Sequence, residues 1–414
     1  MVSLQPVRGT HDLLSDEARR ARYITEIGRS IAERYGFEEA VTPIFEFSDV
    51  FARTLGETSD IVTKEMYTFT DKGGDQVTLR PEGTAGIARA FISSGLSQSL
   101  PQKFFYAGPM FRYERPQKGR LRQFHQFGVE LLGVKEPAGD VEVIALGASI
   151  LDHLGIKGIT RLELNTLGNA ESRAAYRAAL VEYFNDFRAQ LSKDSQDRLI
   201  RNPLRILDSK NEGDQKIIAG APHLDEVLDS ESKEIFASVC LGLDTLDIPW
   251  KRNARLVRGL DYYCHTAFEF TTDGLGTQTA VLAGGRYDGL VEQMGGPPTP
   301  GVGWASGVER LSMLIKDAPE RIRPIAVVPL GEAADVLALS LTEALRRDGI
   351  SVDIAYRGNL KRRMKRANSI NACVAVIIGD EELAQLSAMV RDLDSGNQQL
   401  VLLEDLSSHL RQFL

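Results

Sequence analysis

At 414 residues the chain is long enough for two or three domains, each with an ample core. Hydrophobic residues make up 43% and charged residues 26% of the sequence, which is ordinary for a globular protein. The net charge of −8 argues against a protein that coats nucleic acid non-specifically. Any contact with nucleic acid must therefore come from local basic patches.

The three cysteines and six histidines are scattered without any paired spacing. The sequence thus indicates neither a disulfide framework nor a zinc site, and we assign no metal ligands. No apolar run is long enough to span a bilayer, and the first residues lack the basic-then-apolar pattern of a secretory signal. We therefore expect a cytoplasmic protein without membrane contact.

The first predicted helix covers residues 16–35, with Ser15 as its cap and Gly36 at its end. Residues 37–49 are strand-like, and Pro43 interrupts the ladder, which is typical of an edge strand. An exposed edge of this kind commonly pairs with another subunit.

A hairpin is predicted from residues 65–69 and 76–79, and a helix follows at about residue 85. Glu82 and Thr84 stand between them. They either cap this helix or present a carboxylate and a hydroxyl to the ammonium group of a ligand.

Residues 104–113 and 123–132 predict a second hairpin, joined by a charged loop. Arg112, Gln126 and Glu130 lie among aromatic residues in its strands, where burial is costly unless such groups are paired. Either the charges are simply solvated, or the hairpin is the floor of a site for a phosphorylated, aromatic-bearing substrate.

A helix over residues 140–154 and a strand over 161–167 follow, and then the chain becomes largely helical and charged. We interpret that stretch as an inserted helical module. Residues 255–270 return to strand-like composition. Gly284 and Gly285 form either a plain bulge or a surface where a ligand lies against backbone. Arg310 stands where a small-residue strand runs into a helix, a place suited to phosphate oxygens.

After Pro324, strands alternate with helices, which predicts a small and mostly parallel α/β domain. One of its helices carries the basic run from Lys361 to Arg366. The run is either a solvated helix face or a patch for nucleic acid.

Together these stretches resemble the class II aminoacyl-tRNA synthetases, and among them the histidyl-tRNA synthetase family, across essentially the whole chain. The first class motif is represented by Pro43, the second by the stretch from Phe111 to Phe124, and the third by Gly307-Val308-Glu309-Arg310. Residues 258–263 and 284–288 resemble the signatures that set the histidine enzymes apart.

The resemblance implies an α+β fold: an antiparallel β-sheet catalytic core flanked by helices, a helical insertion and a C-terminal α/β anticodon-binding domain. We expect the catalytic core in residues 1–169 and 246–320, the insertion in 170–245 and the anticodon-binding domain in 325–414. The resemblance also implies a homodimer. It implies ATP-dependent ligation of L-histidine to tRNA(His) through a histidyl-adenylate, with Mg²⁺ assisting.

The resemblance assigns the site residues as well. Arg112, Arg258 and Arg310 would be catalytic, with Arg112 and Arg258 on the α-phosphate and the reacting carboxylate. ATP would be bound by Arg112, Glu114, Arg120, Phe124 and Arg310. Histidine would be bound by Glu82, Thr84, Gln126, Glu130, Tyr262, Tyr263, Tyr287, Gly284 and Gly285. For tRNA we expect contacts from Arg115, Gln117, Lys118, Arg122, Lys361, Arg362 and Lys365.

Two departures from the family stand out. Cys264 and His265 follow Tyr263 where many members carry polar or basic residues, and Leu121 occupies a loop position that is often aromatic. The main rival is a non-catalytic relative, such as the histidine-sensing regulatory subunit of ATP phosphoribosyltransferase, which keeps the fold. It is disfavoured because Arg112, Arg258 and Arg310 are all present. A second rival passes its adenylate to an acceptor other than tRNA.

Overall fold

The computed structural model describes residues 4–55, 61–117, 119–207, 209–257, 262–276, 279–315 and 319–413. It divides into two compact units, residues 1–319 and 320–414. No helix within the described ranges is long and apolar enough to cross a membrane.

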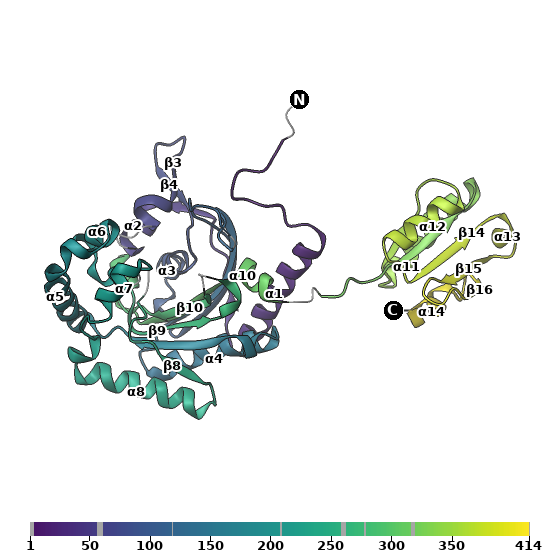
Figure 1. The fold of residues 1–414 in the computed structure, drawn as a ribbon. Coiled ribbons are helices and arrows are strands. Elements are labelled where there is room, and N and C mark those ends of the chain that lie inside the picture. Colours follow the sequence, from purple (N-terminus) through teal and green to yellow (C-terminus); the bar gives the residue numbers. More distant parts are fainter. Residues whose placement is uncertain are drawn as a thin grey trace. The chain divides into compact units, whose positions relative to one another are not determined.

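An eight-stranded sheet forms the centre of the first unit (Figure 1). Its five inner pairings are antiparallel, and its two outermost pairings are parallel. In spatial order the strands are β1 (Glu38–Glu39), β5 (Gln102–Phe111), β6 (Gln123–Leu132), β11 (Gly301–Gly307), β10 (Ala280–Arg286), β9 (Cys264–Thr271), β7 (Arg161–Thr166) and β8 (Trp250–Arg252).

Helices cover one face of this sheet, where Phe105, Phe127 and Trp304 pack into the main core. The helices on that face are α1 (Ser15–Arg34), α4 (Pro137–His153), α8 (Ser230–Thr245) and α10 (Val308–Leu314). Because side chains alternate along a strand, the odd-numbered residues of β6 enter this core and the even-numbered ones face the other way. Phe124, Gln126 and Glu130 are among the latter.

The opposite side carries a second core, which includes Phe51, Phe91 and Tyr287. It is built with α2 (Ser48–Leu55), α3 (Thr84–Ser93) and α9 (Leu290–Gln293), beside a small sheet of β2 (Phe45–Phe47), β4 (Gln76–Leu79) and β3 (Tyr67–Thr70).

The structure confirms both predicted hairpins, since β3 pairs with β4 and β5 with β6 in antiparallel register. Two local predictions are wrong. Helix α1 begins at Ser15 itself, preceded by Leu14, and has no side-chain cap. The stretch 37–49 is not one strand, because the chain leaves the large sheet after β1 and joins the small sheet at β2.

The helical stretch after β7 contains α5 (Ala170–Asp186), α6 (Lys193–Arg201) and α7 (Glu212–Ile218), which share a core of their own. At its centre, Asp214 accepts hydrogen bonds from the hydroxyls of Ser192, Ser195 and Ser209 at 2.6–2.7 Å. Helix α8 instead contributes Phe236 and Val239 to the main core against α4. The predicted insertion thus contains a helix that packs with the catalytic sheet.

The second unit has a five-stranded sheet in the order β13-β12-β14-β15-β16. Its elements are β12 (Ile325–Pro329), α11 (Glu332–Arg347), β13 (Val352–Ile354), α12 (Leu360–Ser369), β14 (Val374–Ile378), α13 (Asp380–Ala384), β15 (Ser387–Asp392), β16 (Gln398–Leu402) and α14 (Leu406–Leu410). The prediction of a mostly parallel sheet missed β15, which pairs antiparallel with both of its neighbours.

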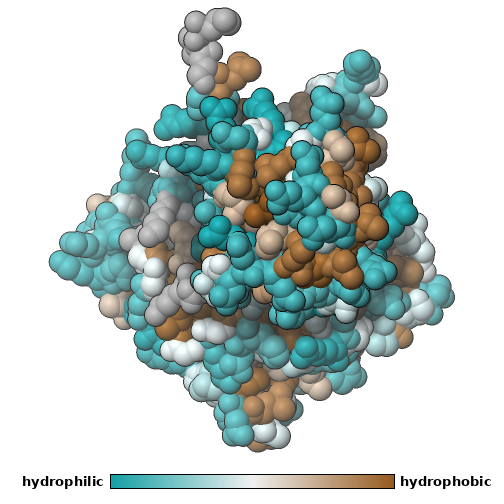
Figure 2. All heavy atoms as spheres, turned by 90° about the vertical axis from the view of Figure 1, so that its right-hand side faces the viewer, coloured by the Kyte–Doolittle hydropathy of each residue, from teal (hydrophilic) through white to brown (hydrophobic). Residues whose placement is uncertain are grey.

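Several large apolar side chains of the second unit are exposed, among them Val336, Leu339 and Leu386. Figure 2 shows one face of the molecule, on which apolar atoms gather in patches among hydrophilic ones.

Candidate active site

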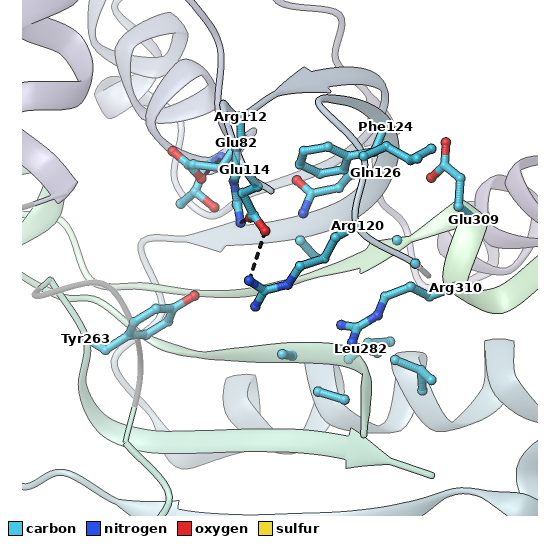
Figure 3. Close-up of a pocket in the computed structure, with 18 of the residues that line it drawn as sticks. Glu82, Arg112, Glu114, Arg120, Phe124, Gln126, Tyr263, Leu282, Glu309 and Arg310 are labelled. Carbon is cyan, nitrogen blue, oxygen red and sulfur yellow. Dashed lines mark hydrogen bonds and ion pairs between the residues drawn. The ribbon is translucent and has the colours of Figure 1, made fainter. Parts of the chain in front are cut away.

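A cavity of about 230 Å³ opens over the even-numbered face of β6. Its lining combines charged, aromatic and small residues from the loop between β5 and β6, from β6, β10 and β11, and from the starts of α3 and α10 (Figure 3). Of the predicted site residues, those that line it are Glu82, Thr84, Arg112, Glu114, Arg120, Phe124, Gln126, Tyr262, Tyr263 and Arg310.

Three arginines reach this cavity from two directions. Arg112 follows β5, and its Nε donates to the carbonyl oxygen of Pro81 at 2.9 Å. Its guanidinium lies 5.3 Å from the centre of the Phe124 ring. Arg120 projects from the loop and pairs with the Glu114 carboxylate at 2.9 Å.

Arg310 enters from α10, on the other side of the cavity from Arg112 (Figure 3). Burial lowers the pKa of Arg310, and the neighbouring cation of Arg120 lowers it further. A guanidinium remains charged at any physiological pH, so the cavity concentrates positive charge where a polyanion would be stabilised.

Glu309, next to Arg310, anchors the hairpin to α10. Its carboxylate accepts from the backbone N–H of His125 at 3.0 Å and lies 2.8 Å from the His125 ring. The sequence analysis gave neither residue a role. Their spacing of 184 residues explains why, because only the fold brings them together.

Hydrogen-bonding groups line the part of the cavity next to Arg112 (Figure 3). The Glu82 carboxylate accepts from the backbone N–H groups of Thr84 and Ala85 at 2.7 and 2.8 Å, so it caps α3. The Glu82 side chain also lines the cavity, so capping the helix does not keep it from contacting a ligand. Oε1 of Gln126 is buried and has no hydrogen-bond partner among the described residues. It is therefore available to accept from a ligand.

Glu130 is fully buried and does not line the cavity. Its carboxylate accepts from the Thr84 hydroxyl at 2.6 Å and from the Tyr287 hydroxyl. Burial raises the pKa of Glu130 to about 8, although both hydroxyls act in the other direction. Glu130 and Tyr287 thus form a layer beneath Thr84, which alone of the three reaches the cavity.

Close packing of strands accounts for the glycines of this region. A Cβ at Gly284 would overlap the carbonyl oxygen of Gly303, and a Cβ at Gly303 would overlap the Glu130 carboxylate. A Cβ at Gly285 would come within 2.9 Å of the Tyr263 ring. Neither Gly284 nor Gly285 lines the cavity, so here the missing side chains make room for neighbouring strands and for Tyr263.

The described residues that are predicted to contact tRNA do not line the cavity. Arg115 and Gln117 are exposed on the hairpin loop. Arg122 stacks on Tyr113, with 3.9 Å between its guanidinium and the ring centre. Lys118 and Arg258 lie outside the described residues.

The basic residues of helix α12 fall into two groups, those paired with carboxylates and those exposed to solvent. Arg363 is buried and pairs with Asp335 at 3.1 Å, and Arg366 pairs with Asp353 at 2.9 Å. Lys361, Arg362 and Lys365 are exposed. These three are the residues predicted to meet tRNA.

The antiparallel sheet with its helical cover and cationic hairpin is the catalytic fold of a class II aminoacyl-tRNA synthetase. A family model described as "Histidyl-tRNA synthetase" matches residues 9–311, and one described as "Anticodon binding domain" matches residues 324–413. The chain belongs to the histidyl-tRNA synthetase family.

Curated relatives agree over the full length. The chain is 61% identical over 417 residues to a protein of Rhodospirillum rubrum named "Histidine--tRNA ligase", with 100% of both chains covered. It is 56% identical to one of the same name from Gluconacetobacter diazotrophicus, with 99% of each covered.

Among solved structures, the apo histidyl-tRNA synthetase of S. aureus superimposes with a TM-score of 0.82 at 36% identity, covering 98% of this chain and 99% of that one. A structure described as an ATP phosphoribosyltransferase regulatory subunit/histidyl-tRNA synthetase from Bacillus halodurans shares the fold at 21% identity and a TM-score of 0.66. The fold alone therefore does not separate the synthetase from its regulatory relative, whereas the full-length relatives favour the synthetase.

Proposed function

We propose that this protein activates L-histidine with ATP and transfers the histidyl group to tRNA(His), releasing AMP and pyrophosphate. The observation that carries the proposal is one cavity that is lined both by arginines and by buried hydrogen-bonding groups, in a chain that matches histidine–tRNA ligases along its full length.

The arginines on the two sides of the cavity suit ATP. Attack of a carboxylate on the α-phosphate brings two anions together, so cations must neutralise the growing charge. Arg112 would hold the α-phosphate and the reacting carboxylate, and Arg310 the γ-phosphate. Arg258 would share the role of Arg112, and its position remains a prediction.

The base of ATP would lie against the Phe124 ring. The Arg112 guanidinium next to this ring fixes its orientation. Glu114, held by Arg120, would accept from the adenine amine.

The hydrogen-bonding groups of the cavity suit histidine. Glu82, Thr84 and Gln126 would bind the α-ammonium group, since two carboxylate or amide oxygens and a hydroxyl converge there. Glu130, below Thr84, and Tyr263 would read the nitrogens of the imidazole ring, with Tyr262 and Tyr287 lining its pocket. An amino acid that leaves these buried polar groups unpaired would be rejected strongly.

Mg²⁺ would accompany the phosphates of ATP and neutralise part of their charge. The carboxylates of Glu114 and Glu309 line the same cavity, and oxygen ligands of this kind suit Mg²⁺. All other charge stabilisation in this proposal comes from the arginines.

The tRNA would be bound at two places, one in each unit. Arg115, Gln117, Lys118 and Arg122 on the hairpin loop would meet the acceptor end. The exposed side chains of Lys361, Arg362 and Lys365 on α12 would meet phosphates of the anticodon arm. We assign the catalytic core to residues 1–169 and 246–320, the helical insertion to residues 170–245 and the anticodon-binding domain to residues 325–414.

A homodimer through the segment around Pro43 completes the proposal. Val41 is 81% exposed, and Phe45 and Phe47 are more than half exposed. Such a group of large apolar side chains on an edge segment is typical of a subunit interface. We place the enzyme in the cytoplasm, where its tRNA substrate is used.

Charging of unfractionated tRNA with labelled histidine tests the proposal. We expect acid-precipitable, alkali-labile label that requires both ATP and tRNA. Adenylate formation without transfer to tRNA would favour the ligase with another acceptor. Absence of both steps would favour the regulatory subunit.

A further inference from the structure

Three side chains with metal-binding atoms meet where β9 begins and β10 ends. Cys264 and His265 open β9, and Asp288 lies two residues beyond β10. One ligand atom from each, the Cys264 thiol sulfur, a His265 ring nitrogen and an Asp288 carboxylate oxygen, lie within 4.8 Å of one another. We propose that Cys264, His265 and Asp288 form a zinc site next to the amino acid pocket.

The ligand set favours Zn²⁺ over harder ions. Sulfur and imidazole nitrogen are ligands of Zn²⁺, whereas Mg²⁺ and Ca²⁺ prefer oxygen alone. Zinc bonds of about 2.0–2.3 Å in a tetrahedron place the ligand atoms about 3.5 Å apart. Separations of up to 4.8 Å must therefore shrink by at most about 1.3 Å to reach this spacing, which side-chain rotation can supply. Three protein ligands leave a fourth position for water.

The carboxylate of Asp288 is held ready by its surroundings. Its Oδ1 accepts from Arg286 at 3.1 Å and from the backbone N–H of Gly301 at 3.2 Å. Both hydrogen bonds go to the same oxygen, which orients Oδ2 as the ligand atom. Hydrogen bonds of this kind to ligands are a regular feature of metal sites.

The charges of the side chains around the proposed zinc site balance that of the ion. Arg286 also forms a buried ion pair with Asp140, so these two side chains together are neutral. A Cys264 thiolate and the Asp288 carboxylate then supply two negative charges for Zn²⁺. Nδ1 of His265 is buried without a hydrogen-bond partner among the described residues. A buried polar atom of this kind is explained when it serves as a ligand.

Zinc binding would form a Zn–S bond at Cys264 as the thiol proton leaves to solvent.

The backbone fixes the direction of the histidine. His265 has a φ of +44°, a left-handed conformation that is uncommon for residues other than glycine. Its N–H donates to the carbonyl oxygen of Gly168 at 2.8 Å, and its carbonyl oxygen accepts from Leu167 at 2.6 Å. A zinc ion here would join the segment of Tyr262 and Tyr263 to the turn after β10.

Cobalt substitution tests the site spectroscopically. The purified, chelator-treated full-length protein is titrated with Co²⁺, whose thiolate complexes show a charge-transfer absorption. We expect the band to saturate at one equivalent and zinc to displace it. The Cys264→Ser variant should lose the band and bind zinc at least about 100-fold more weakly, since loss of a residue that only supports a ligand already costs about 10- to 100-fold. The matched variants Cys240→Ser and Cys373→Ser should keep both properties.

X-ray absorption at the zinc edge of the wild-type protein removes any dependence on a variant's folding. We expect one sulfur neighbour at about 2.3 Å together with nitrogen and oxygen neighbours. A shell of nitrogen and oxygen alone would overturn the proposal. So would a cobalt band that survives Cys264→Ser.

Discussion

The hydroxyl of Thr84 donates a hydrogen bond of 2.6 Å to Oε1 of Glu130. Thr84 lines the cavity, whereas Glu130 is fully buried beneath it. A ligand in this cavity would therefore reach the glutamate through the threonine hydroxyl, or only after the threonine side chain rotates. We therefore expect the two residues to act as one unit in recognising histidine.

Removing either member of this unit should weaken histidine use and spare ATP. For Glu130→Ala we expect KM for histidine to rise about tenfold or more, with KM for ATP changed less than about threefold. Pyrophosphate exchange at varied histidine and varied ATP measures both values. Equal losses for the two substrates would contradict the role of Glu130.

A double-mutant cycle tests whether the two residues act together. Thr84→Val removes the donor and Glu130→Met removes the acceptor of the hydrogen bond, and both changes keep the approximate size of the side chains. We expect the double variant to be less impaired in histidine KM than the sum of the single effects, by about 0.5–3 kcal/mol. Strict additivity would show that the residues act independently.

The buried carboxyl of Glu130 should also make stability depend on pH. Because its pKa is raised from 4.5 to about 8, the folded protein holds a proton there that the unfolded chain releases near pH 4.5. This stabilising contribution is complete below pH 4.5 and is lost as pH rises through about 8. The Glu130→Gln variant has no carboxyl group at this position, so it should not lose this stability as the pH rises.

Urea unfolding of the ligand-free proteins measures this effect. The free energy of unfolding of Glu130→Gln relative to wild type should increase between pH 5 and pH 8, on the order of a few kcal/mol, and level off above that. A difference that is flat across this range would argue against a raised pKa.

Arg112 should be needed for chemistry more than for substrate binding. Its guanidinium donates to the Pro81 carbonyl oxygen and lies next to the Phe124 ring, a geometry that the lysine ammonium cannot reproduce. We expect Arg112→Lys to slow adenylate formation about 100-fold. Arg115→Lys is the control, since Arg115 is exposed and does not line the cavity. A pure loss of affinity in Arg112→Lys would contradict the assignment.

The buried pair of Arg286 and Asp140 should support the fold. Arg286 is 2% exposed and Asp140 is not exposed, and the pair ties the end of β10 to the first turn of α4. Arg286→Met leaves a buried charge without its partner, so we expect a loss of about 3–5 kcal/mol in the free energy of unfolding. Adding Asp140→Asn should recover part of it. A double variant less stable than the single one would argue against this explanation.

The local pattern of the sequence was sufficient to predict the hairpins, because period-two alternation and turn residues are local signals. It could not indicate that 37–49 divides between two sheets, since that depends on which strand each half pairs with. Strand β15 was missed because its partner strands, not its own composition, define it.

In the candidate site, too, some features follow from the sequence and others only from the folded structure. Motif resemblance named ten residues that do line the cavity. It did not reveal that Glu130 and Tyr287 lie one layer below, because a side chain's depth depends on packing. Nor could it bring Asp288 to Cys264 and His265, which are more than 20 residues earlier in the chain.

The most direct test of the account is ATP–pyrophosphate exchange, run separately with each of the standard amino acids. We predict exchange with histidine far above background, and none with apolar or acidic amino acids at the same concentration. Exchange that does not depend on histidine, or none with any amino acid, would contradict the claim that this cavity activates histidine.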